Sequence, residues 1–334
     1  MSAANNKSLS FYFAVFFSVI GFVIAIAANA VVPQIATGVI IENYDFYGLA
    51  LNMNGTYRIV LALIAAFYLA EGIFSAFDKG RRKKYQKRAA FRFAAGLALL
   101  LWDLLGTKLL LLPQPFFPGP AGIVRAFLIE SDYILQNTLY SLRLFFFGFA
   151  IGVVFGIGTG VLIGWFPKVY YWVSPVLNVS GVIPAVAWMP FALTLFPTPF
   201  AAAVFLIVIS VWFPVASLAA SGVQSAPKAL FEVARTLGAR TPGLLFFVAI
   251  PHAMPQIFTG INTASAFAFT TLVMAEMMGQ PGGLGYYINA SKVWSAYYKV
   301  FAAIIVMAIL FSLISALIKL VEARVLRWQK GLLK

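Results

Sequence analysis

The sequence of 334 residues contains no cysteine, one histidine and few charged residues. Without cysteine the chain can form no disulfide, no thiolate metal site and no cysteine nucleophile. The histidine, His252, has no second histidine with which to bind a metal, so we assign it a structural role. Charged residues make up 10% of the chain and apolar residues 62%, with a mean hydropathy of +0.92. Such a chain has too little polar surface for a soluble globule and is expected to be an integral membrane protein.

Motifs for catalysis and nucleotide binding are also missing. The glycine-rich run GGLGYYI at residues 282–288 has no lysine and no flanking strand and helix, so it does not predict a phosphate-binding loop. The apolar runs carry no carboxylate pair, and we therefore expect neither an enzyme nor a cofactor bound by this chain. Because alternating-polarity segments typical of outer-membrane barrels are absent, the sequence predicts a helical bundle.

Long apolar runs predict eight membrane spans, since a helix needs about 20 apolar residues to cross a hydrocarbon core about 30 Å thick. They lie near residues 11–33, 58–77, 92–112, 134–165, 172–196, 200–221, 252–275 and 300–321. The first run could instead be a signal peptide, but its length and the lack of a convincing cleavage site at its end favour a span.

The distribution of basic residues predicts the orientation. The run KGRRKKYQKR at residues 79–88 lies between the second and third spans, so the positive-inside rule places it and both termini in the cytoplasm. The C-terminal tail is also basic, whereas Lys292 and Lys299 fall on the predicted outer side as exceptions. The net charge of +14 is concentrated beside the spans, which favours anionic lipid headgroups as a partner over nucleic acid.

A polar segment at residues 223–251 interrupts the apolar spans on the predicted cytoplasmic side. Pro227 begins an amphipathic helix in which Glu232 and Arg235 lie on one side, and Gly238 is expected to end it. A more apolar piece follows and leads to Pro251, which we expect to set how the chain enters the seventh span.

The run EVARTLGARTPGLLFFVAIP at residues 232–251 resembles the cytoplasmic signature loop of binding-protein-dependent ATP-binding cassette (ABC) importers. That signature reads Glu-Ala-Ala, three residues, Gly, about nine residues, then Ile-x-Leu-Pro. The sequence departs from it at Val233 and Ile250, both apolar substitutions. The resemblance extends over residues 92–325, where NTLYSLRLFFFGFAIGVVFGIGTGVLIGW, IPAVAWMPFAL and AEMMGQPGGLGYYI are similar to the branch for nitrate, sulfonate, taurine and bicarbonate.

The resemblance implies an all-α integral membrane protein with a six-helix type I importer permease core and two extra N-terminal transmembrane helices. The expected parts are an N-terminal extension at 1–90, the core at 91–325, the coupling-helix loop at 223–251 and a basic tail at 326–334. A bacterial cytoplasmic (inner) membrane is the implied location, with both termini cytoplasmic.

The resemblance also implies partners. In this family the loop forms a coupling helix that docks in a cleft of the ATPase. The expected complex is a homodimer of the permease with two ATPase subunits, which hold ATP and Mg, and an extracytoplasmic solute-binding protein. The residues expected to couple to the ATPase are Glu232, Val233, Ala234, Arg235, Gly238, Ala239 and Pro251. The competing interpretation is a solvated loop whose glutamate merely caps a helix.

The candidate substrate path lies in the fifth and seventh spans. Two prolines should break the helix around residues 184–190, and broken helices at mid-membrane often mark transport sites. On the seventh span, threonines and a methionine recur on one face. The candidates are Pro184, Trp188, Met189, Thr263, Thr270, Met274 and Glu276. Plain helix packing is the alternative for Trp188, Met189, Thr263, Thr270 and Met274. Glu276 could contact a binding protein, pair within the chain or lie at a solvated helix end.

Two further features of the fourth span favour structural roles. Gly148, Gly152, Gly156 and Gly160 repeat every four residues and predict a smooth face against which another helix packs. Arg143 has the position of a buried charge, and we favour a structural role for it over anion attraction.

The function these features favour is the permease subunit of an ATP-driven importer for a small anion of the sulfonate, taurine, nitrate or bicarbonate type. The alternative is an ATP-independent channel or an ion-coupled secondary transporter. Such proteins normally need intramembrane charges or an internal repeat, and the sequence shows neither clearly.

Overall fold

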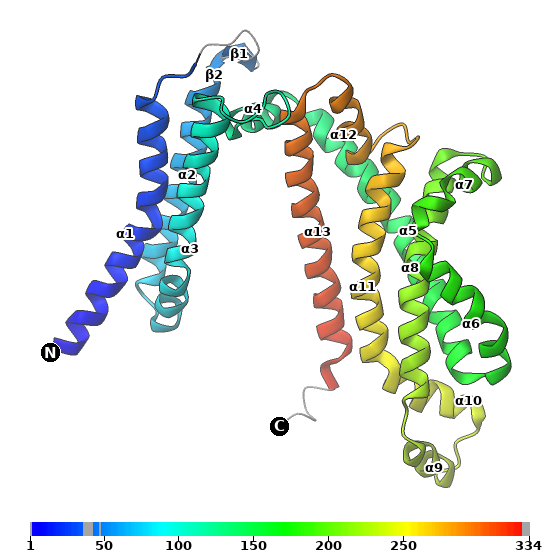
Figure 1. Cartoon of the computed structure of the whole chain (residues 1–334). Helices are drawn as coiled ribbons and strands as arrows, with labels where there is room; N and C mark the ends of the chain where they lie inside the picture. Colours follow the sequence, from blue (N-terminus) through cyan, green and yellow to red (C-terminus); the bar gives the residue numbers. More distant parts are fainter. Residues whose placement is uncertain (1, 36–42, 47, 329–334) are drawn as a thin grey trace. The chain divides into compact units, whose positions relative to one another are not determined.

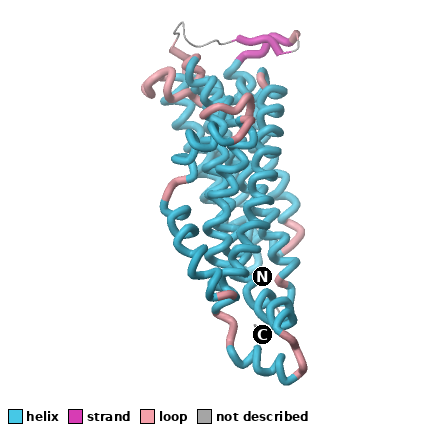
Figure 2. Tube along the Cα trace, turned by 90° about the vertical axis from the view of Figure 1, so that its right-hand side faces the viewer, coloured by secondary structure: helices cyan, strands magenta, loops and turns pink. Residues whose placement is uncertain are grey.

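The computed structural model describes residues 2–35, 43–46 and 48–328, and this part of the chain is helical apart from loops and one short strand pair (Figure 2). The end of the predicted basic tail, 329–334, lies outside the described residues. The chain divides into two compact units. The first consists of Met1–Ser131 and Ser291–Ala302, and the second of Asp132–Ala290 and Ala303–Lys334.

The first unit contains three long helices, a hairpin and a short apolar helix (Figure 1). Its elements are α1 (Ser2–Val31), β1 (Asn43–Phe46), β2 (Leu49–Asn52), α2 (Met53–Ser75), α3 (Lys79–Asp103), the π-helical turn η1 (Leu104–Lys108) and α4 (Pro120–Ile129). The strands pair antiparallel with Asn43 opposite Asn52, and the side chain of Asn52 then caps α2 by accepting the N–H of Gly55 at 3.1 Å.

The second unit contains the remaining helices, which Figure 1 shows in green to red. They are α5 (Ser131–Trp165), α6 (Pro167–Val182), the 3-10 turn η2 (Ala185–Trp188), α7 (Met189–Leu195), α8 (Pro199–Gln224), α9 (Lys228–Thr236), α10 (Thr241–Leu244), the π-helical turn η3 (Leu245–Ala249), α11 (Ile250–Met277), α12 (Leu284–Val293) and α13 (Tyr297–Val325). The first residue of α5, the end of α12 and the start of α13 fall in the first unit.

The long apolar runs are helical as predicted. Among the described residues, seven helices are long and apolar enough to cross a membrane. The pair formed by α6 and the segment Ala185–Leu195 passes the same test but is bent by 100°, and counting it as one span gives eight. The bend lies where prolines were expected to break the fifth span: Pro184 precedes η2, and Pro190 sits in the first turn of α7.

Within the first unit, close backbone contact joins α3 to α1. A Cβ atom added at Gly96 would lie 2.6 Å from the carbonyl carbon of Gly21, so the two helices cross where both residues lack a side chain. The guanidinium of Arg92, 4% exposed, donates to both carboxylate oxygens of Glu71 on α2 at 2.9 Å. The first unit runs to Ser131 and so includes the whole of α3.

The glycine face of α5 packs against α8. A Cβ added at Gly148 would lie 2.7 Å from Ile207, and one added at Gly152 would lie 2.7 Å from Val211. Real Cβ atoms do not approach so closely, so only glycine permits this separation of the helix axes. The regular spacing of the glycines thus predicted a helix contact correctly, and the structure identifies α8 as the partner.

Candidate functional site

The helix α9 and its flanking turn have the form that the sequence predicted. Pro227 is the N-cap, and after Thr236 the chain turns through Gly238, whose φ of +86° strongly favours glycine. The N–H of Gly238 donates to the carbonyl of Arg235 at 2.9 Å, and the N–H of Ala239 donates to the carbonyl of Ala234 at 3.0 Å. These two hydrogen bonds form a Schellman motif, which fixes the C-terminal end of α9.

The outer surface of α9 is apolar as well as charged. Leu230, Val233 and Leu237 lie three and four residues apart on one face and are 45%, 58% and 83% exposed. None of the residues of α9 is buried within the chain. An exposed apolar stripe on a short rigid helix is typical of a surface that packs against another protein.

The charged side of α9 is held near the end of α5. Trp165, Lys228, Phe231, Glu232 and Arg235 line a pocket of about 310 Å³. The rings of Trp165 and Phe231 lie 5.9 Å apart and anchor α9 to α5. The ion pairs among the described residues include neither Glu232 nor Arg235, so both charges are available to a partner.

Pro251 is the second residue of α11, which continues without a break from α10 and η3. The segment Thr241–Met277 forms a single span with a π-helical turn at Leu245–Ala249 directly before Ile250. The N–H of Ile250 reaches back to the carbonyl of Leu245. Such a turn relieves the clash that a proline makes with the preceding turn of an α-helix. Pro251 therefore shapes the connection from α9 to the span without interrupting it.

A cavity of about 360 Å³ lies beside the bend between α6 and η2. Its lining includes Pro184 from the bend together with Thr270 and Met274 from α11, so three candidate path residues from two spans meet there. The hydroxyl of Thr270 donates to the carbonyl of Ala266 at 3.1 Å, which leaves the oxygen able to accept a further bond.

An exposed stripe runs along α11 next to this cavity. It contains Thr263, Phe267, Thr270 and Met274, whose spacing places them on one face. Apolar and hydroxyl side chains alternate along the stripe. Thr263 does not line the cavity but continues the same face toward the start of α11.

The two remaining candidates from the bend differ in position. Trp188 lines a neighbouring apolar cavity of about 390 Å³, which also includes Trp212. Met189 is 1% exposed and packs in the hydrophobic core of the second unit, with Leu206 of α8. Burial on all sides gives Met189 a packing role in this chain.

Residues 152–327, a stretch that includes α9 and the bend, match the protein family described as the binding-protein-dependent transport system inner membrane component. The chain belongs to this family. It is an ABC importer permease, a multi-pass membrane protein whose family implies an ATPase and a solute-binding protein as partners.

The permease is similar to two transport proteins along most of their length. It is 29% identical over 255 residues to SsuC of Bacillus subtilis (strain 168), named for aliphatic sulfonates transport, with 76% of this chain and 92% of SsuC covered. It is 28% identical over 241 residues to the taurine transport system permease protein TauC of Escherichia coli (strain K12), with 70% and 87% covered. Its fold is similar to that of the methionine ABC transporter MetNI, with a TM-score of 0.50, 22% identity, and 59% of this chain and 97% of that one covered.

Glu276 lies in a buried network of the permease rather than in the cavity at the bend. Three successive N–H groups of the glycine-rich turn donate to buried side chains: Gly283 to Asn137 at 3.0 Å, Leu284 to Ser141 at 2.9 Å and Gly285 to Glu276 at 2.8 Å. The Glu276 side chain is 1% exposed. These N–H groups lie at the start of α12, where the first N–H groups of a helix have no carbonyl of the same helix to accept them. A carboxylate there accepts such an N–H group and interacts favourably with the helix dipole. The sequence alone does not point to Asn137 or Ser141, because no motif pairs them with backbone groups 146 and 143 residues away.

Other polar residues also differ from expectation. Arg143 is exposed within the chain, with its guanidinium 5.2 Å from the centre of the Phe200 ring, and is not buried as its position in the span suggested. In the first unit Asp103 is 1% exposed and accepts the amide of Asn29 at 2.7 Å. Charged side chains therefore do occur within the apolar helices. In the sequence, the sign that these residues are unusual was that each is a charged residue isolated within an apolar run.

Proposed function

We propose that the permease pairs with a second copy to form the path of a small oxyanion of the sulfonate or taurine type, and that ATPase subunits drive transport by contacting α9. The observation that carries this proposal is the exposed, rigidly ended helix α9, with its apolar stripe and with Glu232 and Arg235, which take part in no ion pair among the described residues. A helix with these properties transmits a push from a partner to the spans on either side of it. ATP and Mg belong to the ATPase in this proposal, and the permease itself is neither an enzyme nor a cofactor carrier.

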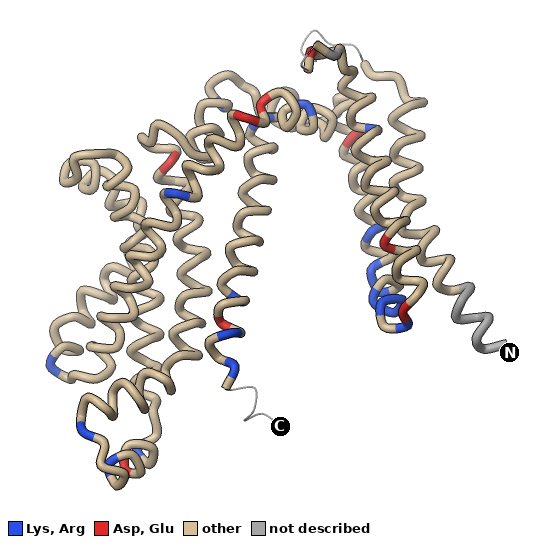
Figure 3. Tube along the Cα trace, turned by 180° about the vertical axis from the view of Figure 1, so that it is seen from behind, with Lys and Arg blue, Asp and Glu red and all other residues tan. Residues whose placement is uncertain are grey.

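We place the permease in the inner membrane of a bacterium, as its family description suggests. The distribution of its charge supports an orientation with α9 in the cytoplasm. In Figure 3, Lys and Arg gather in the first unit at the turn between α2 and α3, and in the second unit near α9 and the end of α13. The positive-inside rule then places both termini on the cytoplasmic side. The basic turn at 79–88 faces anionic lipid headgroups in this orientation.

The proposed path uses the cavity at the bend and the exposed stripe of α11. Pro184, Trp188, Thr263, Thr270 and Met274 form its wall, while the buried Met189 and Glu276 line neither cavity. A second copy facing the stripe encloses the space between the two bends. The hydroxyls of Thr263 and Thr270 donate to the carbonyls of Thr259 and Ala266, so they give the wall polar oxygens without a fixed charge that would trap an anion.

Reconstitution into liposomes tests the ATP-driven mechanism. We expect uptake of a sulfonate such as taurine only when the permease is reconstituted with its ATPase, its binding protein and ATP, because no step in the permease alone supplies energy. Uptake by the permease alone would establish the channel or secondary transporter instead. For the assembly, we expect two ATPase subunits to copurify with each permease dimer.

Filling the cavity at the bend tests the path. Thr270→Trp places an indole in a space of about 360 Å³, and we expect ATP-driven uptake to fall about tenfold or more because a filled path leaves no room for the solute. The control is Ser312→Trp, which adds an indole at an exposed hydroxyl residue of α13 outside the cavity. Equal uptake by the two variants would place the path elsewhere.

A further inference from the structure

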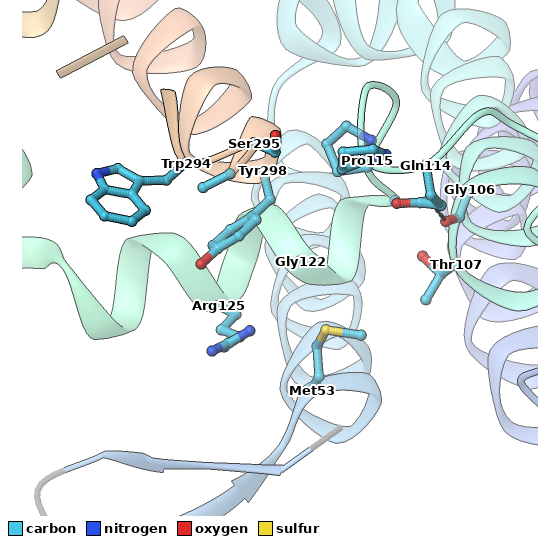
Figure 4. A pocket seen from close by; sticks show the side chains of 13 residues that line it. Met53, Gly106, Thr107, Gln114, Pro115, Gly122, Arg125, Trp294, Ser295 and Tyr298 are labelled. Carbon is cyan, nitrogen blue, oxygen red and sulfur yellow. Dashed lines mark hydrogen bonds between the residues drawn. The ribbon is translucent and has the colours of Figure 1, made fainter. Parts of the chain in front are cut away.

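A second cavity, of about 370 Å³, lies in the first unit among residues that the transport proposal does not use. Figure 4 shows its lining: Gly122 and Arg125 come from α4, Trp294, Ser295 and Tyr298 from the segment around the start of α13, and Gln114 and Thr107 from the chain between α3 and α4. Cavities of 300 to about 1,000 Å³ are the usual size of small-molecule sites.

Arg125 is the charged residue of this lining. Its Nε is buried and has no hydrogen-bond partner among the described residues, and none of their ion pairs includes it. The guanidinium carbon lies 5.6 Å from the centre of the Tyr298 ring and 5.9 Å from that of the Tyr44 ring. The rings lie against the guanidinium but accept none of its in-plane N–H bonds, so the described residues supply no anion to this partly desolvated charge.

The walls around Arg125 are fixed by hydrogen bonds. The amide of Gln114 donates to the carbonyls of Gly106 at 3.0 Å and Phe117 at 3.2 Å, and the indole of Trp102 donates to the carbonyl of Pro118 at 3.0 Å. Ser295 adopts a left-handed conformation with φ of +54°, which is unfavourable for a residue with a side chain. A cavity whose walls are held in this way is already formed in the absence of a ligand, and this lowers the free-energy cost of binding one.

We propose that this cavity binds an oxyanion, with the Arg125 guanidinium donating to two of its oxygens. The planar fork of an arginine matches phosphate and sulfonate oxygens in this way. The anion belongs either to a phospholipid headgroup or to a soluble ion, and the chemistry of recognition is the same. The site does not depend on the transport mechanism, because neither α9 nor the cavity at the bend takes part in it.

Equilibrium binding to the purified full-length permease in detergent, without ATPase, tests the proposal. The probes are radiolabelled inorganic phosphate and short-chain phosphatidylglycerol. We expect Arg125→Gln to weaken binding about tenfold or more, because a hydrogen-bonded charge is lost from a partly buried site. Gly122→Leu keeps the charge but fills the cavity, since a Cβ at Gly122 meets only the Cβ of Tyr298, at 3.5 Å. We expect the same loss from it.

The matched control is Arg143→Gln, which removes another arginine that lies over an aromatic ring but outside the cavity. It should bind both probes as the unchanged permease does. Tighter binding of phosphatidylglycerol than of phosphate, with that lipid retained through purification, identifies a headgroup site, and the reverse order identifies a soluble anion. The proposal is wrong if the permease binds neither probe, or if folded Arg125→Gln and Gly122→Leu variants bind both as tightly as the control. Transport assays play no part in these outcomes, so failure here leaves the function proposed above untouched.

Discussion

Replacing Glu232 with alanine should abolish ATP-driven uptake while the permease still inserts in the membrane and keeps its thermal stability. The side chain is exposed and has no ion-pair partner among the residues that the structure describes, so its loss costs the fold little. Truncating one partner of a charge pair in an interface weakens association by about 2–5 kcal/mol, or about 30-fold or more. Uptake by proteoliposomes measures the loss of transport. Copurification of the ATPase measures the weaker association.

Two further variants separate charge from packing at α9. Leu237→Asp places a carboxylate in the exposed apolar stripe and should also release the ATPase. Lys168→Ala removes an exposed charge at the start of α6 and should leave uptake unchanged. If Glu232→Ala and Leu237→Asp both transport as well as Lys168→Ala, α9 is a solvated loop and the coupling proposal fails.

Gly283→Ala should strongly destabilise the permease. Gly283 has a φ of +109°, and an added Cβ would lie 2.3 Å from the carboxyl carbon of Glu276. Backbone strain and overpacking together cost on the order of 3 kcal/mol or more. We expect a clear fall in the thermal midpoint of the purified protein and a low yield in the membrane.

The network around Glu276 supplies a double-mutant test. Glu276→Ala removes the carboxylate that Gly283→Ala would contact, so the double variant should be more stable than the sum of the two single effects predicts. Gly158→Ala is the control, because an added Cβ there meets no atom within 4 Å and alanine favours a helix. A Gly283→Ala variant with the thermal midpoint of Gly158→Ala would show that this turn is not held as the structure has it.

Much of the fold followed from local patterns in the sequence. Apolar runs predicted the spans, the prolines around residues 184–190 predicted the bend, and Gly238 predicted the end of α9. Each of these features depends on neighbouring residues alone, through hydrophobic length, the missing N–H of proline or the backbone freedom of glycine. Recognition of the importer family also needed only contiguous motifs.

The candidate site was harder to predict residue by residue. The sequence placed Met189 and Glu276 with Thr270 and Met274 because all lie on or near the same two spans. The faces they occupy depend on which helix packs behind them, and α8 and the glycine-rich turn bury the first two. Helical spacing gives the angle between residues of one helix, but not the direction of the bundle interior.

By itself the sequence determined the class of protein, its spans and the helix through which we propose that it is driven, because these depend on local composition and short motifs. Only the tertiary structure decided which residues cap α12, that α3 packs with α1, and that Arg125 lines a cavity with no anionic partner among the described residues. The reason is physical: these features arise where segments far apart in the chain meet, and a contact of that kind leaves no periodic signal in either segment.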